Sequence, residues 1–257
     1  MAVRNLYSFN PEDAAAAQEK QRRISELGLN SEIAERLDNS RERSVEVYGD
    51  HAIVPDANKI YEAWAAKPEF QIYYDQLEAE GKAPEIIISA KNLPIDDWQD
   101  IYEPIATNQP EDAPNQLEKD ATDGIGLWFK SNTSATNAYN QLYPDQTEIE
   151  WEITVIPTKG GYKDSGITNV KTEYKDIPTD ITPPTLGALL TYYASHLIRR
   201  EEFPEAAFSW CAETDGSDAL RVGFFSIDRR VRVYWVGVGD SSAGLGVSAS
   251  VRGEVGD

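Results

Sequence analysis

A short stretch near the carboxyl end of the sequence gathers arginine and aromatic side chains. Between Ala219 and Val236 the charged residues are four arginines and one aspartate, a local charge of +3 in a chain whose formal net charge is -20. Phe225, Tyr234 and Trp235 lie in the same stretch. Planar guanidinium and aromatic groups supply large contact areas and directed hydrogen bonds at little cost in rotamer entropy. This composition predicts recognition of another molecule through a surface.

The motifs of common enzyme classes are missing from the sequence. It contains no G-x-S-x-G, no Walker A loop and no H-E-x-x-H. The glycines between Gly237 and Gly246 are no dinucleotide fingerprint, because no helix is expected to open after them. Carboxylate pairs are frequent, but chance explains them among 44 acidic residues. We therefore expect no catalytic residues and no cofactor; an enzyme would need a deep pocket with convergent titratable groups.

The sequence offers little for a metal site. Cys211 is the single cysteine, which excludes intrachain disulfides and cysteine-rich zinc sites. His51 and His196 lie far apart in the sequence, and a zinc site built on histidines would need both of them together with carboxylates. We expect no metal ligands.

Length and charge narrow the class of protein. The chain has 257 residues, 40% of them hydrophobic, which suffices for one large domain or two modest ones with a packed core. A surface this negative repels phosphate groups, so nucleic acid and anionic membranes are poor partners. The sequence has no run of about 18 apolar residues and no secretory signal pattern, so membrane insertion is not expected.

Helices dominate the first half of the chain. The predicted elements are a helix from Pro11 to the stop at Gly28, a short helix capped by Ser31, a helical stretch over 57–80 broken at Pro68, and a buried strand over Glu85–Ser89. Residues 92–123 are rich in Pro, Asn, Asp and Glu, which predicts a long surface connection with a short helix near Asp96–Tyr102. We place a domain boundary here, after a helix-rich α/β region of residues 1–123.

The second half, residues 124–257, is predicted to form strands around one helix. The strands are expected over 126–129, 149–156, 207–212, 219–225, 231–238 and 246–251, and the helix over 185–202. In 149–156, apolar residues alternate with Glu150, Glu152 and Thr154. The predicted fold class is α+β, with a small antiparallel sheet in the carboxy-terminal domain.

Alternation places the arginines on an outer face of this sheet. Successive side chains of a strand point to opposite faces. The residues expected to face the core are Leu220, Val222, Phe224, Val231 and Val233, and those expected to face outward are Arg221, Gly223, Phe225, Arg230, Arg232 and Tyr234.

Three motifs of the second half occur in an order known from one fold. Pro184-Thr185 precedes the predicted helix, Trp210 to Glu213 lies on a strand, and Gly246 to Arg252 lies near the carboxyl end. This order resembles the C-type lectin-like fold in its disulfide-free form. That form is shared by relatives of formylglycine-generating enzyme and by the variable proteins of diversity-generating retroelements, which carry L-P-T, W-S-S-x-E and a glycine–valine–arginine ending. The match covers about a quarter of the chain.

The resemblance implies a C-type lectin-like ligand-binding domain over residues 124–257, in which strand 149–156 pairs with the last strand. In the retroelement proteins, variable positions derive from asparagine codons changed at adenines, which leaves few asparagines; from Asp176 onward this chain has no Lys, Asn or Gln. The ligand-binding residues that this implies are Cys211, Thr214, Asp215, Ser217, Arg221, Gly223, Phe225, Ser226, Asp228, Arg230, Arg232, Tyr234 and Trp235.

Two departures limit what the resemblance implies. The oxidase branch of the fold uses two active-site cysteines, and this chain has one. The calcium-dependent lectins use Glu-Pro-Asn or Gln-Pro-Asp, and neither tripeptide is present.

The expectation is therefore a non-enzymatic binding protein that presents a diversified, hypervariable surface to a protein or glycan receptor. Display on a virus particle or cell surface, and assembly as a homo-oligomer, go with this expectation. The alternative is a structural protein of a virion or complex, whose carboxy-terminal sheet packs in an oligomer interface.

Overall fold

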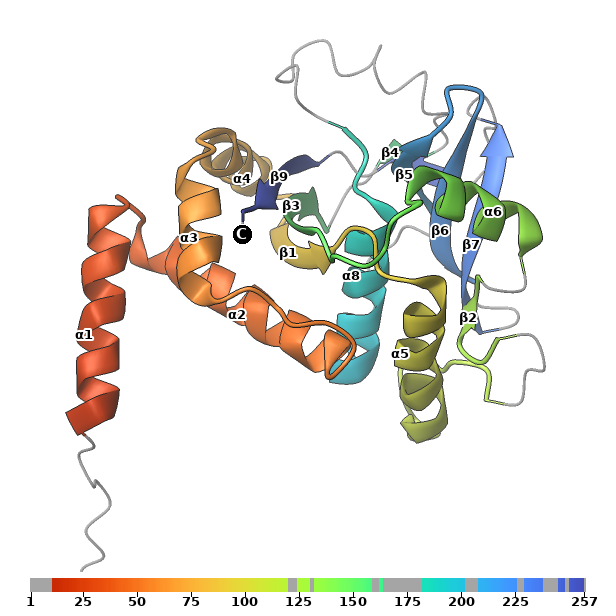
Figure 1. Ribbon diagram of the computed structural model, residues 1–257, viewed down its shortest axis with the longest axis horizontal. Coiled ribbons are helices and arrows are strands. Elements are labelled where there is room, and N and C mark those ends of the chain that lie inside the picture. The colour runs from red at the N-terminus through yellow and green to blue at the C-terminus, as the bar shows by residue number, and fades with distance from the viewer. Residues whose placement is uncertain are drawn as a thin grey trace, which may run out of the picture.

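The computed structural model describes residues 11–119, 124–129, 132–158, 162–163, 182–201, 208–225, 229–237, 245–247 and 250–256 (Figure 1). The helices are α1 (Pro11–Glu26), α2 (Ser31–Tyr48), α3 (Ala57–Ala65), α4 (Glu69–Ala79), α5 (Ile95–Asn108), α6 (Thr133–Leu142) and α8 (Leu186–Arg199). The strands are β1 (Pro84–Ala90), β2 (Leu127–Trp128), β3 (Trp151–Pro157), β4 (Tyr162–Lys163), β5 (Phe208–Thr214), β6 (Asp218–Phe225), β7 (Arg230–Gly237), β8 (Leu245–Val247) and β9 (Val251–Val255).

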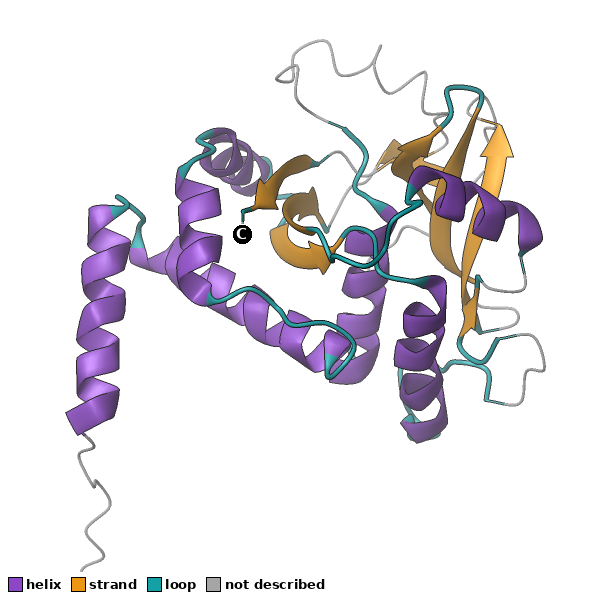
Figure 2. Cartoon of the chain, viewed as in Figure 1, coloured by secondary structure: helices purple, strands orange, loops and turns teal. Residues whose placement is uncertain are grey.

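The fold is mixed α+β, as predicted, and its strands form two sheets (Figure 2). The first is antiparallel, in the order β1-β3-β9. The second has the order β2-β7-β6-β5-β8-β4, and is mixed because β2 runs parallel to β7 and β5 parallel to β8. The predicted pairing of strand 149–156 with the last strand is confirmed: β3 is antiparallel to β9, with Val155 opposite Val251.

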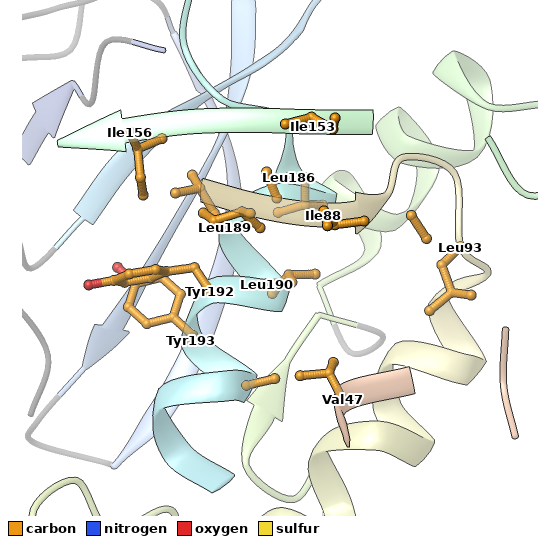
Figure 3. Close-up of a cluster of buried hydrophobic side chains, with 14 of the residues drawn as sticks. Val47, Ile88, Leu93, Ile153, Ile156, Leu186, Leu189, Leu190, Tyr192 and Tyr193 are labelled. Atoms are coloured by element: carbon orange, nitrogen blue, oxygen red, sulfur yellow. The ribbon is translucent and has the colours of Figure 1, made fainter. Parts of the chain in front are cut away.

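Helix α8 lies between the two sheets and forms the centre of the core. It contacts β1 of the first sheet and β5 and β6 of the second. Every residue from Leu186 to Leu197 is buried, including the polar residues Thr191, Ser195 and His196. Figure 3 shows Leu186, Leu189 and Leu190 of α8 beside Ile88 of β1.

The motif residues that carry the resemblance meet at the beginning of α8. Thr185 is the N-cap: its Oγ1 accepts a hydrogen bond from Ala188 N at 3.1 Å and donates one to the Glu152 carboxylate. The Glu213 carboxylate accepts hydrogen bonds from Leu186 N at 3.0 and 2.9 Å. This corner joins α8 to β3 and β5.

Arg252, from the third motif, reaches the same corner. Its Nη1 lies 4.0 Å from Glu152 Oε2, and its Nε donates a hydrogen bond to Thr182 Oγ1 at 3.0 Å. These contacts are structural, because Glu152 and Glu213 are 3% and 5% exposed and so out of reach of a ligand in solution.

Burial of Glu152 predicts a pH-dependent stability. Burial raises the pKa of this carboxyl to about 7, although the Thr185 hydrogen bond and Arg252 oppose the shift. A carboxyl whose pKa is higher in the folded than in the unfolded state stabilises the fold at low pH, and this stabilisation is lost as the pH rises through the folded value. Between pH 5 and pH 8, Glu152 should therefore lower the free energy of unfolding by about 2–3 kcal/mol.

The variant Glu152→Gln tests this dependence. Urea unfolding at pH 5 and pH 8 should show a smaller stability difference for the variant than for the wild type. The exposed Glu103→Gln serves as control and should behave as the wild type does. An equal pH dependence in the wild type and Glu152→Gln would contradict the prediction.

The amino-terminal helices follow the sequence patterns, with one changed boundary. α2 is capped by Asn30, whose side chain accepts a hydrogen bond from Ile33 N at 2.7 Å, and not by Ser31, which is its first residue. The helix has 18 residues and is not short. The predicted break at Pro68 is confirmed, since α3 and α4 lie on either side of it.

The helix predicted near Asp96–Tyr102 is present, but residues 92–119, the described part of the predicted connection, do not lie wholly on the surface. They contain α5, a helix of 14 residues that contacts α8. Trp98 and Tyr102 are fully buried, and the Tyr102 hydroxyl donates a hydrogen bond to Leu190 O at 2.8 Å. The many polar residues of this stretch concealed its buried side.

Two further elements differ from expectation. α6 was not predicted, and β3 is buried at every position instead of on alternate ones, because α-helices cover the first sheet. β1 and β3, which pair in the first sheet, come from opposite sides of the predicted domain boundary between residues 123 and 124. The division into domains at that point stays a prediction.

Among the helices of the described residues, none has the length and apolar composition needed to cross a membrane.

Candidate functional site: an arginine and aromatic face

One face of the second sheet carries the arginines singled out in the sequence. In the antiparallel pair of β6 and β7, Arg221 lies opposite Tyr234, Gly223 opposite Arg232, and Phe225 opposite Arg230. Because paired residues point to the same side of a sheet, these side chains share one face. β2 adds Trp128, which pairs with Arg232 from the other side of β7. We call Trp128, Arg221, Phe225, Arg230, Arg232 and Tyr234 the arginine–aromatic face.

The opposite face of the same strands is core. The residues between the outward positions, Leu220, Val222, Val231 and Val233, are each 0% exposed. The predicted orientation is therefore confirmed for both strands; Phe224 also packs against the core, although it is only partly buried. The six residues of the arginine–aromatic face are all half-buried.

Arg232 is the centre of the arginine–aromatic face. Its guanidinium carbon lies 4.8 Å from the centre of the Phe225 ring and 5.2 Å from the centre of the Trp128 ring. Its Nη1 donates a hydrogen bond to the Tyr234 hydroxyl at 2.8 Å. Gly223, directly opposite, contributes no side chain to the face. Arg232 is thus oriented by three aromatic neighbours.

Two more contacts extend this arrangement. The Arg221 guanidinium lies over the Tyr234 ring at 5.1 Å, and the Tyr234 and Trp128 rings are 5.3 Å apart. Each cation–π contact at a half-exposed site contributes about 0.5–1 kcal/mol. The contacts hold planar groups in defined orientations before any ligand arrives, which reduces the entropy lost on binding.

The charge of the face differs from that of the rest of the chain. No carboxylate occupies an outward position on the described residues of β2, β6 and β7. Three arginines therefore stand together in a chain of net charge -20. Guanidinium groups donate several hydrogen bonds in fixed directions and aromatic rings offer large apolar surfaces, so the arrangement is suited to recognition of another molecule.

Five of the residues predicted to bind ligand lie on this face: Arg221, Phe225, Arg230, Arg232 and Tyr234. Gly223 is buried between them. Ser226 and Asp228 lie outside the described residues.

Cys211 and Trp235, which were also predicted to bind ligand, do not lie on the arginine–aromatic face. Cys211 is 0% exposed and packs in the core, where burial raises the pKa of its thiol well above the usual value. Trp235 follows Tyr234 on β7 and so points to the opposite side, where it packs against the core. The aromatic pair Tyr234-Trp235 is divided between the two faces of the sheet.

Thr214, the last residue of β5, and Asp215 and Ser217 of the turn that leads to β6 are exposed. The Asp215 carboxylate accepts hydrogen bonds from the backbone N of Ser217 and of Asp218, both at 2.8 Å. This turn lies at the end of β6 away from Phe225, and its hydrogen bonds give it a structural role.

The sequence interpretation missed Trp128. Its neighbours Leu127 and Phe129 are both fully buried, whereas Trp128 is half-buried. That alternation was visible in the sequence and indicates an outward tryptophan. The parallel pairing of β2 with β7, which brings Trp128 to Arg232, was not visible there.

The chain matches no known family model, no curated protein and no solved structure.

Proposed function

We propose that this protein is a non-enzymatic binding protein whose arginine–aromatic face recognises a protein or glycan receptor. The observation that supports it best is the arrangement of Arg232 with Trp128, Phe225 and Tyr234 on the outer side of a sheet whose inner side packs against the core. Arginine, tryptophan and tyrosine are the residues that dominate binding energy in protein interfaces.

The proposal includes a scaffold with exchangeable outward side chains, as in the C-type lectin-like variable proteins of diversity-generating retroelements. Three features support this part. β3 pairs with β9, the three motifs meet around the start of α8, and five of the thirteen residues predicted to bind ligand lie on one face. Display on a virus particle or cell surface belongs to the same proposal.

Matched substitutions on neighbouring residues test whether the face is exchangeable. Arg221→Ala and Arg232→Ala should each change the free energy of unfolding by about 1 kcal/mol or less, because they remove half-exposed contacts. Val222→Ala and Val233→Ala, one position along each strand, should cost about 2 kcal/mol because they leave cavities in the core. Urea unfolding measures both. Equal losses on the two sides of the sheet would show that the arginines are structural.

A library experiment tests recognition directly. Positions 221, 225, 230, 232 and 234 are randomised, the variants are displayed on phage, and binders to a folded test protein such as lysozyme are selected. A control library randomises exposed positions on α2, namely Glu32, Glu35, Glu42, Val45 and Glu46. Binders should come from the first library. Failure of that library, or equal success of the control, would count against the proposal.

The assembly role makes a different prediction. If the arginine–aromatic face packed in an oligomer, the double variant Arg232→Ala/Tyr234→Ala would dissociate into monomers in analytical ultracentrifugation. The binding proposal expects the same oligomeric state for the wild type and the double variant.

The neighbouring DNA is a further check on the proposed diversification. Retroelement diversification requires a near-copy of the segment that encodes this face, differing mainly at adenines, beside a reverse transcriptase gene.

A further inference from the structure

Three metal-ligating side chains come together away from the arginine–aromatic face. They are His51, in the segment after α2, and Asp97 and Asp100 on α5. One ligand atom from each lies within 4.8 Å of the others, and His51 Nδ1 is 3.2 Å from the nearest Asp97 oxygen, Oδ1.

The backbone explains why these residues meet. α2 ends at Tyr48, and a turn in which His51 N donates a hydrogen bond to Tyr48 O at 2.8 Å directs the chain toward α5. Asp97 and Asp100 are three residues apart on α5, and so lie on one side of that helix. Asp97 lies in the first turn of α5, where a negative charge interacts favourably with the helix dipole. This interaction does not explain why Asp100 and His51 lie beside Asp97.

A cavity adjoins the three residues, and it is an independent observation that points to a ligand. Its volume is about 460 Å³, and His51 and Asp100 are part of its lining. Val47, Ile101 and Leu197 provide apolar walls, and the charged groups Glu46, Asp50 and Arg200 complete the lining near His51. Cavities of this size with a few polar groups are typical of small-molecule sites.

We propose that His51, Asp97 and Asp100 bind one divalent transition-metal ion of the zinc class, with its open coordination positions directed toward the cavity. An imidazole nitrogen with two carboxylate oxygens is a donor set that zinc accepts in proteins. Metal–ligand distances of about 2.0–2.2 Å place ligand atoms about 3–4 Å apart. The exposed Asp100 side chain closes the remaining gap by rotation.

Isothermal titration of the full chain with ZnCl2 at pH 7.5 tests the proposal. One ion should bind per chain with a micromolar dissociation constant. His51→Ala, Asp97→Asn and Asp100→Asn should each weaken binding at least about tenfold. Asp50→Asn, an exposed carboxylate that lines the same cavity but lies outside the set, should bind as the wild type does.

Two results would overturn the proposal. One is zinc binding that His51→Ala leaves unchanged, because the ion would then be held elsewhere. The other is binding of MgCl2 as tight as that of ZnCl2, which would indicate a carboxylate cluster without an imidazole ligand. Urea unfolding of each variant confirms that a loss of binding is not a loss of fold.

Discussion

Replacement of Gly187 by alanine is expected to destabilise the protein by more than about 3 kcal/mol. Gly187 lies in the first turn of α8, where the helix passes over β1. A Cβ atom at this position would lie 2.1 Å from Ala90 O and 3.1 Å from Ala90 C. Both atoms belong to the backbone of a paired strand, so no side chain can move aside, and α8 must shift away from the first sheet.

The better helix propensity of alanine, worth about 0.5–1 kcal/mol, does not offset this clash. Urea unfolding measures the loss. Gly256→Ala is the matched control, because nothing lies within 4 Å of a Cβ at that position, and it should change stability by less than about 0.5 kcal/mol. A wild-type stability for Gly187→Ala would mean that α8 does not approach β1 this closely.

Replacement of Glu213 by alanine is expected to cost about 3–5 kcal/mol. The Glu213 carboxylate accepts hydrogen bonds from Leu186 N and, at 2.9 Å, from the Tyr143 hydroxyl. Alanine leaves both donors without this acceptor in a buried site and also creates a cavity. Burial raises the pKa of this carboxyl, so part of the cost of the side chain in the wild type is its own desolvation.

Glu213→Gln is the informative comparison. The amide keeps one oxygen that can accept from Leu186 N and Tyr143 Oη, and it fills the same volume. We expect it to lose at most about half as much stability as Glu213→Ala, as measured by urea unfolding at pH 7. Equal losses in the two variants would show that the negative charge, and not the hydrogen bonds, stabilises the start of α8.

Both positions bear on the proposed function because α8 supports the second sheet. It contacts β5 and β6, and the inward side chains of β6 pack in the same core. Because α8 packs against the inner side of this sheet, the outward residues of β6 and β7 can be substituted without a change in the packing of the core. Damage to the support, by contrast, should abolish binding together with the fold.

Local patterns in the sequence determined the types of most elements and the orientation of the arginines. Alternation on β6 and β7 was enough to place Arg221, Arg232 and Tyr234 on one side. The same rule, applied consistently, also places Trp235 on the opposite side from Tyr234. A threonine before an apolar helical run was enough to indicate the start of α8. These features depend on neighbours within a few residues, which a sequence displays directly.

The tertiary structure alone decided which distant segments meet. Trp128 reaches Arg232 because β2 pairs with β7, and His51 reaches Asp100 because α2 and α5 lie on either side of the same cavity. The polar composition of the stretch around α5 gave no indication that Trp98 and Tyr102 of this helix are buried. Composition averages over the two sides of a helix, and pairing between distant strands depends on how the whole core packs. Neither the buried side of α5 nor the pairing of β2 with β7 can be deduced from any short run of residues.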